Sequence, residues 1–189
     1  MKQAGFALVI EEKKEVQQMS DFKIDLNMEV HNLTNGTLTL GQAIDRIVNY
    51  IQEEPDKEYD IAIGTDSMTY STTQFALAIT VHRLHNGGIF FYKRFYHDKI
   101  ANLHYKLHEE TSISVETADL LVDQFFERGI DLTDKNGKIH FHIHLDIGNN
   151  GPTKELIQEL SGWITALGYD FEIKPDSYAA SHIADKYSK

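Results

Sequence analysis

Two alternating apolar segments joined by a glycine-rich turn constrain the fold of this chain more than any other feature. Residues 75–84 and 89–96 alternate between apolar and polar side chains, as half-buried strands do, and Asn86-Gly87-Gly88 between them is typical of a β-hairpin. The short apolar segment 60–66 precedes them and ends on a carboxylate, and residues 68–73 have turn-like chemistry. Together these segments predict a three-strand antiparallel meander.

The rest of the chain alternates between helical and strand patterns. Apolar residues spaced by three and four predict a helix near 40–53, with Thr39 as its N-cap, and a long helical region over 101–128. The patterns that follow predict a strand at 138–147, a helix from Pro152 to Gly168, a strand at 169–174 and a C-terminal helix from 175–177 onward. This order predicts an α/β fold with a mixed sheet, in which two further strands join the meander and helices cover both faces.

The chain is expected to form one domain preceded by a short appendage. Residues 1–20 contain a mixed charge run at 11–15, which is typical of a solvated segment. Residues 21–189 hold the predicted strands and helices, including the extra helix near 40–53. A chain of this length is large enough for one domain with a sizeable core.

Composition excludes several classes of protein. The sequence has no cysteine, which excludes disulfides, thiolate metal sites and cysteine catalysis, and no apolar run approaches the ~20 residues of a membrane span. We therefore expect a cytoplasmic protein without a membrane partner. The formal net charge of −11 argues against a tight, non-specific grip on nucleic acid, although an enzyme can still approach phosphates through bound metal.

Three aspartates fall where such a sheet would bring the ends of its elements together. Asp66 ends the first strand of the meander, Asp146 ends the strand at 138–147, and Asp185 lies in the C-terminal helix. Each of them alone could simply cap a strand end or a turn. Together they supply the oxygen ligands that Mg²⁺ or Mn²⁺ prefers, and so predict a site for two hard divalent cations.

The segments around these acids resemble the ribonuclease H-like superfamily, and most closely its bacterial YkuK-type family. The resemblance rests on GTDS at 64–67, HLDIGNNGPTKELI at 144–157 and KPDSYAASHIADKY at 174–187. It extends over residues 60–189. A fold of the ribonuclease H-like type is therefore expected.

The resemblance also implies an activity and its residues. In that superfamily, acids from the first strand, the first long helix, the fourth strand and the last helix bind two metal ions, which activate a water to cleave a phosphodiester. Carried over to this sequence, Asp66, Asp146 and Asp185 take three of these places. His182, close to the last of them, becomes a candidate for proton transfer or product release. The substrate would be RNA or DNA.

The fourth acid is expected in the long helical region. An apolar stripe runs along it, formed by Leu103, Leu107, Ala118, Leu121 and Phe125. Glu110 lies on this stripe, whereas Glu116 points nearly the opposite way. Because an acid must face the sheet to reach the metals, we predict Glu110 as the ligand, with Glu116 as the alternative if residues 112–114 break the helix. Asp176 is the alternative to Asp185, although it suits an N-cap better.

Alternating histidines offer a second metal-binding hypothesis. His140, His142 and His144 share one face of a predicted strand, and imidazole suits Zn²⁺ or Ni²⁺. The same face could instead pack against a helix or a polar layer. Lys154 and Lys186 are candidate phosphate contacts, and equally could be ordinary surface lysines.

Two alternatives to a nuclease stay open from the residues alone. One is a non-catalytic module that binds a protein partner, which the acidic balance would suit. The other is a transition-metal binder built on the histidine strand. Metal dependence separates the three hypotheses, because Asp66→Asn should abolish Mn²⁺ binding by the acids, leave a histidine site intact, and change nothing in a pure interaction module.

Overall fold

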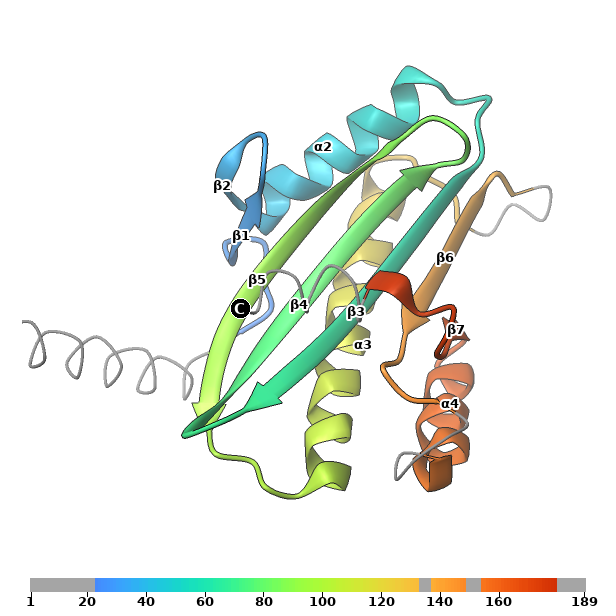
Figure 1. Cartoon of the computed structure of the whole chain (residues 1–189). Coiled ribbons are helices and arrows are strands. Elements are labelled where there is room, and N and C mark those ends of the chain that lie inside the picture. The colour runs from blue at the N-terminus through green and yellow to red at the C-terminus, as the bar shows by residue number, and fades with distance from the viewer. Residues whose placement is uncertain (1–22, 133–136, 149–153, 180–189) are drawn as a thin grey trace, which may run out of the picture.

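A computed structural model describes residues 23–132, 137–148 and 154–179 (Figure 1). Its centre is a mixed seven-stranded sheet with the strand order β2-β1-β5-β4-β3-β6-β7. The sheet and the helices packed on it confirm the predicted α/β class. The predicted appendage at residues 1–20 lies outside the described residues.

The predicted meander forms the middle of the sheet. Its strands are β3 (Tyr59–Thr69), β4 (Thr72–Arg83) and β5 (Gly88–Asp98), which pair antiparallel in sequence order. The first hairpin differs from the prediction, because β3 continues past Asp66, which pairs with Ala76 inside the ladder. The turn expected over 68–73 is wrong for most of that span. Thr69 pairs with Thr73 and their hydroxyls are 3.1 Å apart, so polar side chains extend the ladder instead of ending it.

Two parallel strands complete the sheet beyond β3. β6 (Ile139–His144) pairs parallel to β3, and β7 (Asp170–Glu172) pairs parallel to β6. The ladder between β3 and β6 ends where Gly64 faces His144, two residues before Asp66. Among the described strands, only β4 pairs with β3 beyond that point, so no further strand lies beside β3 at Asp66 on the side of β6.

The opposite edge of the sheet carries a hairpin that the sequence analysis missed. β1 (Glu29–Asn32) and β2 (Gly36–Thr39) pair antiparallel with each other, and β1 lies beside β5. Asn32 builds the turn, because its side-chain oxygen accepts hydrogen bonds from the backbone N–H groups of Thr34 and Asn35. Strands of four residues are too short for the alternation of side chains to identify them.

The first helix matches its prediction. α2 (Leu40–Glu53) begins with a capping box, in which the Thr39 hydroxyl accepts from the backbone N–H of Gln42 and the Gln42 side chain accepts from the backbone N–H of Thr39. Its buried stripe consists of Leu40, Ala43, Ile44, Ile47, Val48 and Ile51.

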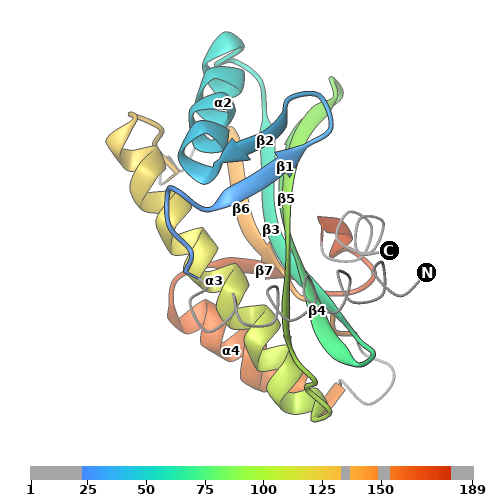
Figure 2. The ribbon, with the colours of Figure 1, turned by 90° about the vertical axis from the view of Figure 1, so that its left-hand side faces the viewer.

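The other helices lie on the same face of the sheet as α2. These are α3 (Leu103–Glu127) and α4 (Ile157–Ala166), the latter preceded by a 3-10 turn, η2 (Lys154–Leu156). Figure 2 shows α2, α3 and α4 on one side of the sheet and the last described residues, which end at Ala179, on the other. The predicted C-terminal helix for that second face lies almost entirely outside the described residues. Within the described ranges, no helix is long and apolar enough to cross a membrane.

A buried arginine holds the end of β3 that lies away from Asp66. The Arg83 guanidinium donates to the Tyr59 hydroxyl at 3.1 Å and to the Tyr50 carbonyl at 2.7 Å, and it pairs with Glu54. It also lies 4.0 Å from the ring centroid of Tyr50, which is a cation–π contact. These contacts join the end of α2 to β3 and β4 and close the core there.

Candidate metal centre

Three of the predicted acids line one pocket, where β3, α3 and the chain after β6 meet. Asp66, Glu110 and Asp146 border a cavity of about 210 Å³. We call this cavity, together with the three acids, the acidic pocket. The rest of its wall consists of Leu103, Lys106, Leu107, Gly148 and Lys174. Because the β6 ladder stops at Gly64, side chains from β3 and from its neighbours can meet at the open side of the strand.

Glu110 is the most buried of the three acids, with 5% of its surface exposed. One of its carboxylate oxygens accepts a hydrogen bond from the Ser67 hydroxyl at 2.6 Å. Burial raises the pKa of Glu110 to about 8, and the negative charges of Asp66 and Asp146 act in the same direction, against the Ser67 hydrogen bond and the Lys106 ammonium. A cation placed among these acids would reverse the balance and favour the ionised carboxylate.

The alternative ligand in α3 points away from the pocket. Glu116 is exposed, and one of its oxygens accepts from the Ser112 hydroxyl at 3.2 Å. α3 continues without a break through residues 112–114. Ser114 instead fastens the helix to the sheet, since its hydroxyl donates to the Thr65 hydroxyl at 2.9 Å. The helix therefore presents Glu110, and not Glu116, to the sheet.

Asp146 is positioned by backbone hydrogen bonds on both sides. Leu145 N–H donates to the Glu172 carbonyl and Lys174 N–H donates to the Ile147 carbonyl, each at 2.9 Å, so the chain after β6 stays beside the chain that leaves β7. The same alignment brings Lys174 to the acid, with its Nζ atom 2.9 Å from Asp146 Oδ1. That oxygen is buried and has no hydrogen bond of good geometry. The ammonium of Lys174 therefore offsets its charge but does not supply a well-aligned hydrogen bond.

Comparison with known proteins places the chain in a family. The ribonuclease H-like family profile matches residues 42–189. The chain belongs to the ribonuclease H-like family. A relative from Bacillus subtilis (strain 168), called uncharacterized protein YkuK, is 36% identical over 165 residues, which cover 84% of this chain and 96% of the relative. No solved structure matches the chain.

The remaining residues that the ribonuclease H-like resemblance implies fall at the C-terminus. Asp185 and His182 lie outside the described residues, as does Lys186, so their roles stay predictions. Lys154 is the first residue of η2. Asp176, the alternative to Asp185, is exposed in the turn after β7, where its backbone N–H donates to the Ile173 carbonyl at 2.9 Å.

The histidine strand lies on the sheet face opposite α3. Its buried part forms what we call the histidine network, made of Asp60, His142, His144 and Tyr178. His142 Nε2 lies 3.1 Å from Asp60 Oδ1 and 3.1 Å from His144 Nε2, and the Tyr178 hydroxyl donates to Asp60 Oδ2 at 2.6 Å. The backbone N–H of Ala179 donates to His144 Nδ1 at 3.0 Å. His140 is exposed and outside this network.

Two members of the histidine network, His144 and Asp60, have lowered pKa values for different reasons. Burial, with a smaller contribution from His142, lowers the pKa of His144 to about 4 and keeps it neutral. Burial opposes ionisation of Asp60, but hydrogen bonds from His142 and Tyr178 outweigh it and lower the pKa of that carboxyl. The charge of Asp60 is therefore stabilised by protein groups.

Sequence reasoning missed three residues that complete the acidic pocket in this ribonuclease H-like chain. Ser67 directly follows Asp66, and Lys106 precedes Glu110 by one helical turn, so local spacing could have found both. Lys174 could not be found in this way, because only the parallel pairing of β6 with β7 brings it to Asp146.

Proposed function

We propose that this chain is a metal-dependent nuclease that binds Mg²⁺ or Mn²⁺ through Asp66, Glu110 and Asp146, with Asp185 as the fourth acid. The observation that carries the proposal is the convergence of three carboxylates on one pocket in which burial holds the pKa of Glu110 at about 8. Without a metal, protonation of Glu110 and the ammonium of Lys174 limit the repulsion among these carboxyls, and a bound cation would allow all three to be ionised together. Several carboxylate oxygens are the donor set that hard divalent cations prefer.

The chemistry of the donor set fits a divalent cation, because its ligand atoms are carboxylate oxygens. Asp146 Oδ1 already faces a cation, the ammonium of Lys174, whose side chain is 50% exposed. Lys174 can therefore turn into solvent when a metal ion takes its place, without leaving a buried charge behind. When bound, the ions would supply the Lewis acidity for in-line hydrolysis of a phosphodiester.

The chain's own residues would prepare the site for this chemistry. Ser67 fixes the Glu110 carboxylate by its hydrogen bond, and β3 fixes Asp66 by pairing with β4. The two lysines in the wall, Lys106 and Lys174, would attract the phosphate of the substrate. With a net charge of −11, the rest of the protein would repel a long polyanion, so we propose a small footprint on RNA or DNA.

A titration of the full chain with Mn²⁺, paired with a cleavage assay, tests the proposal. Wild type, Asp66→Asn and Glu110→Gln are compared by calorimetry, and each is incubated with end-labelled single-stranded RNA, RNA–DNA hybrid and structured DNA. We expect both variants to bind Mn²⁺ at least about 10-fold more weakly and to lose metal-dependent cleavage. Glu116→Gln is the matched control, because it makes the same change on the exposed side of α3.

The outcomes separate the metal site from the activity. Equal Mn²⁺ affinity in wild type and Asp66→Asn would contradict the acidic pocket as a metal centre. Mn²⁺ binding that depends on Asp66, without cleavage of any of the three substrates, would retain the metal centre and contradict the nuclease.

A further inference from the structure

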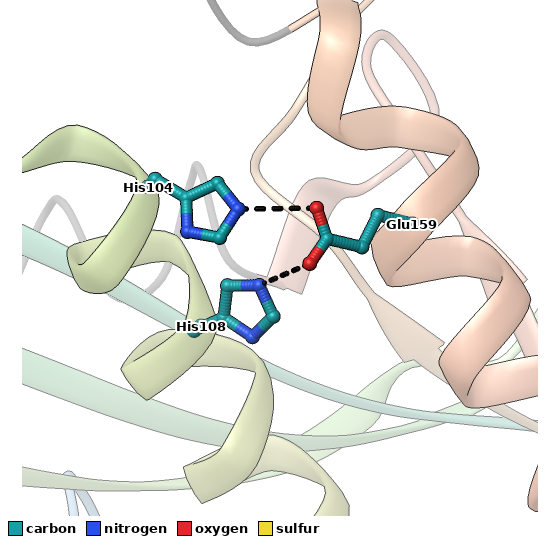
Figure 3. A group of neighbouring side chains, drawn as sticks. All are labelled: His104, His108 and Glu159. Atoms are coloured by element: carbon teal, nitrogen blue, oxygen red, sulfur yellow. Dashed lines mark hydrogen bonds and ion pairs between the residues drawn. The ribbon is translucent and has the colours of Figure 1, made fainter.

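Two histidines and a glutamate link α3 to α4 on the outside of the molecule (Figure 3). His104 and His108 are one helical turn apart in α3, and Glu159 lies in the first turn of α4. His104 Nε2 is 3.1 Å from one carboxylate oxygen of Glu159, and His108 Nε2 is 2.9 Å from the other. Both imidazoles thus aim the same ring nitrogen at one carboxylate.

We propose that His104, His108 and Glu159 bind a Zn²⁺ ion that fastens α4 to α3. Bonds of about 2.0–2.2 Å at tetrahedral angles separate the ligand atoms of zinc by about 3.3–3.6 Å. One ligand atom from each of the three residues already lies within 4.8 Å of the other two, so small side-chain rotations bring them to that spacing. Two histidines at positions i and i+4 of a helix are a recurrent zinc-binding arrangement.

The donor set sets this site apart from the acidic pocket. Two imidazole nitrogens and one carboxylate suit Zn²⁺, whereas the all-oxygen set of Asp66, Glu110 and Asp146 suits Mg²⁺ or Mn²⁺. The site does not depend on the proposed nuclease activity.

The exposure of His104 and Glu159 would let the ion exchange with solvent, and the packing of His108 would keep it in one position. The side chains of His104 and Glu159 are 52% and 49% exposed, which gives an ion free access and leaves a coordination position for water. Trp163 limits the movement of His108, because their rings are stacked with centroids 6.0 Å apart and planes 23° apart. The ion would lie between two rigid helices.

A metal at this position would also fix the surroundings of the acidic pocket. Leu103 and Leu107, which wall the pocket, belong to the same turns of α3 as the two histidines. α4 connects the chain that carries Asp146 to β7 and Lys174. Joining α3 to α4 would therefore hold both sides of the pocket at a constant separation.

Trp163 provides a direct test, because it is the one tryptophan of the chain and touches the proposed site. The metal-stripped full chain is titrated with Ni²⁺, a quenching ion for the same ligands, while the emission of Trp163 is followed, and with Zn²⁺ by calorimetry. We expect stoichiometric quenching, displacement of Ni²⁺ by Zn²⁺ but not by Mg²⁺, and a higher thermal unfolding midpoint with Zn²⁺. His108→Ala and Glu159→Gln should each weaken Zn²⁺ binding at least about 10-fold and remove the Zn²⁺-dependent shift of the midpoint.

Controls separate this site from the other histidines and from the acidic pocket. His140→Ala removes an exposed histidine of β6 and should leave Zn²⁺ affinity unchanged. Glu110→Gln should also retain the Zn²⁺ response, whatever it does to Mn²⁺ binding. Wild-type Zn²⁺ affinity in a His104→Ala/His108→Ala double variant, or a loss of Zn²⁺ binding that follows His142→Ala instead, would overturn the proposal.

Discussion

The acidic pocket and the histidine network both gather ionisable side chains at the central strand β3, yet they are in opposite electrostatic states. In the histidine network, hydrogen bonds from His142 and Tyr178 outweigh burial and lower the pKa of Asp60, while burial keeps His144 neutral. In the acidic pocket like charges share a small cavity, and the pKa of Glu110 rises to about 8. Protein groups stabilise the charged Asp60 in the histidine network, whereas the carboxyls of the acidic pocket would be stabilised by a cation.

This difference distinguishes a structural polar cluster from a binding site. Burying ionisable groups stabilises a fold only when partners within the protein offset the lost hydration. The histidine network meets that condition through Tyr178 and the backbone of Ala179. In the acidic pocket, Ser67, Lys106 and Lys174 offset the burial only in part, because the pKa of Glu110 still rises to about 8, and a bound cation would recover the remainder.

The largest expected effect is on the rate of cleavage, which should depend on the acidic pocket and not on the histidine network. Asp146→Asn removes a carboxylate from the acidic pocket, and we expect metal-dependent cleavage to fall at least about 100-fold. His142→Asn disturbs the histidine network, and we expect cleavage to stay within about threefold of wild type when measured well below the unfolding temperature. An equal loss of cleavage activity in both variants would contradict the assignment of catalysis to the acidic pocket alone.

The next effect concerns the pH dependence of stability, which should come from the histidine network. His144 has a folded-state pKa of about 4 against a reference value of 6.5, so its contribution is present above pH 6.5 and is lost as the pH falls from 6.5 to about 4. The shift corresponds to roughly 3 kcal/mol of unfolding free energy at most. His144→Gln should flatten the curve from urea unfolding over this range, and His140→Gln, on the exposed part of the same strand, should not.

The sequence predicts the long elements and part of the acidic pocket, but not the contacts that depend on strand pairing. Alternation and helical spacing identify β4, β5, α2 and α3, because each element is long and its buried face is regular. The same spacing places Glu110 on the face of α3 that meets the sheet. Pairing in three dimensions decides the rest, including the extension of β3 past Asp66 and the contact of Lys174 with Asp146.

A smaller effect is expected on the stability of the metal-free protein. Asp66→Asn removes one of the charges that raise the pKa of Glu110, and we expect the free energy of unfolding at pH 8 to rise by about 0.5–1 kcal/mol. An excess of Mn²⁺ should reverse the order, because the variant binds the ion more weakly and gains less stability from it than wild type. Asp45→Asn breaks an ion pair with Arg128 outside the pocket and serves as the control, for which we expect no gain. An equal rise in the unfolding free energy of Asp45→Asn would mean that the effect comes from the change in net charge and not from the acidic pocket.

The smallest effect concerns the lysine that faces the acidic pocket. Lys174→Gln removes the ammonium beside Asp146, and we expect Mn²⁺ affinity to rise about two- to fivefold at low ionic strength, with the gain shrinking as salt is added. Lys138→Gln breaks the exposed pair with Asp56 and should leave the affinity unchanged. Weaker Mn²⁺ binding in Lys174→Gln would mean that this lysine orients the carboxylate instead of competing with the ion.

The unequal pairing along β3 has a consequence for local opening. From Tyr59 to Gly64 the strand pairs with a strand on each side, and Arg83 anchors its first residue. From Thr65 to Thr69 it pairs with β4 alone among the strands that the structure describes. Amide hydrogens in the first half should exchange with solvent only on global unfolding, and those in the second half through smaller fluctuations. The end that carries Asp66 should therefore open locally more often than the anchored end, and under the proposed function this opening would give a nucleic acid strand access to the acidic pocket.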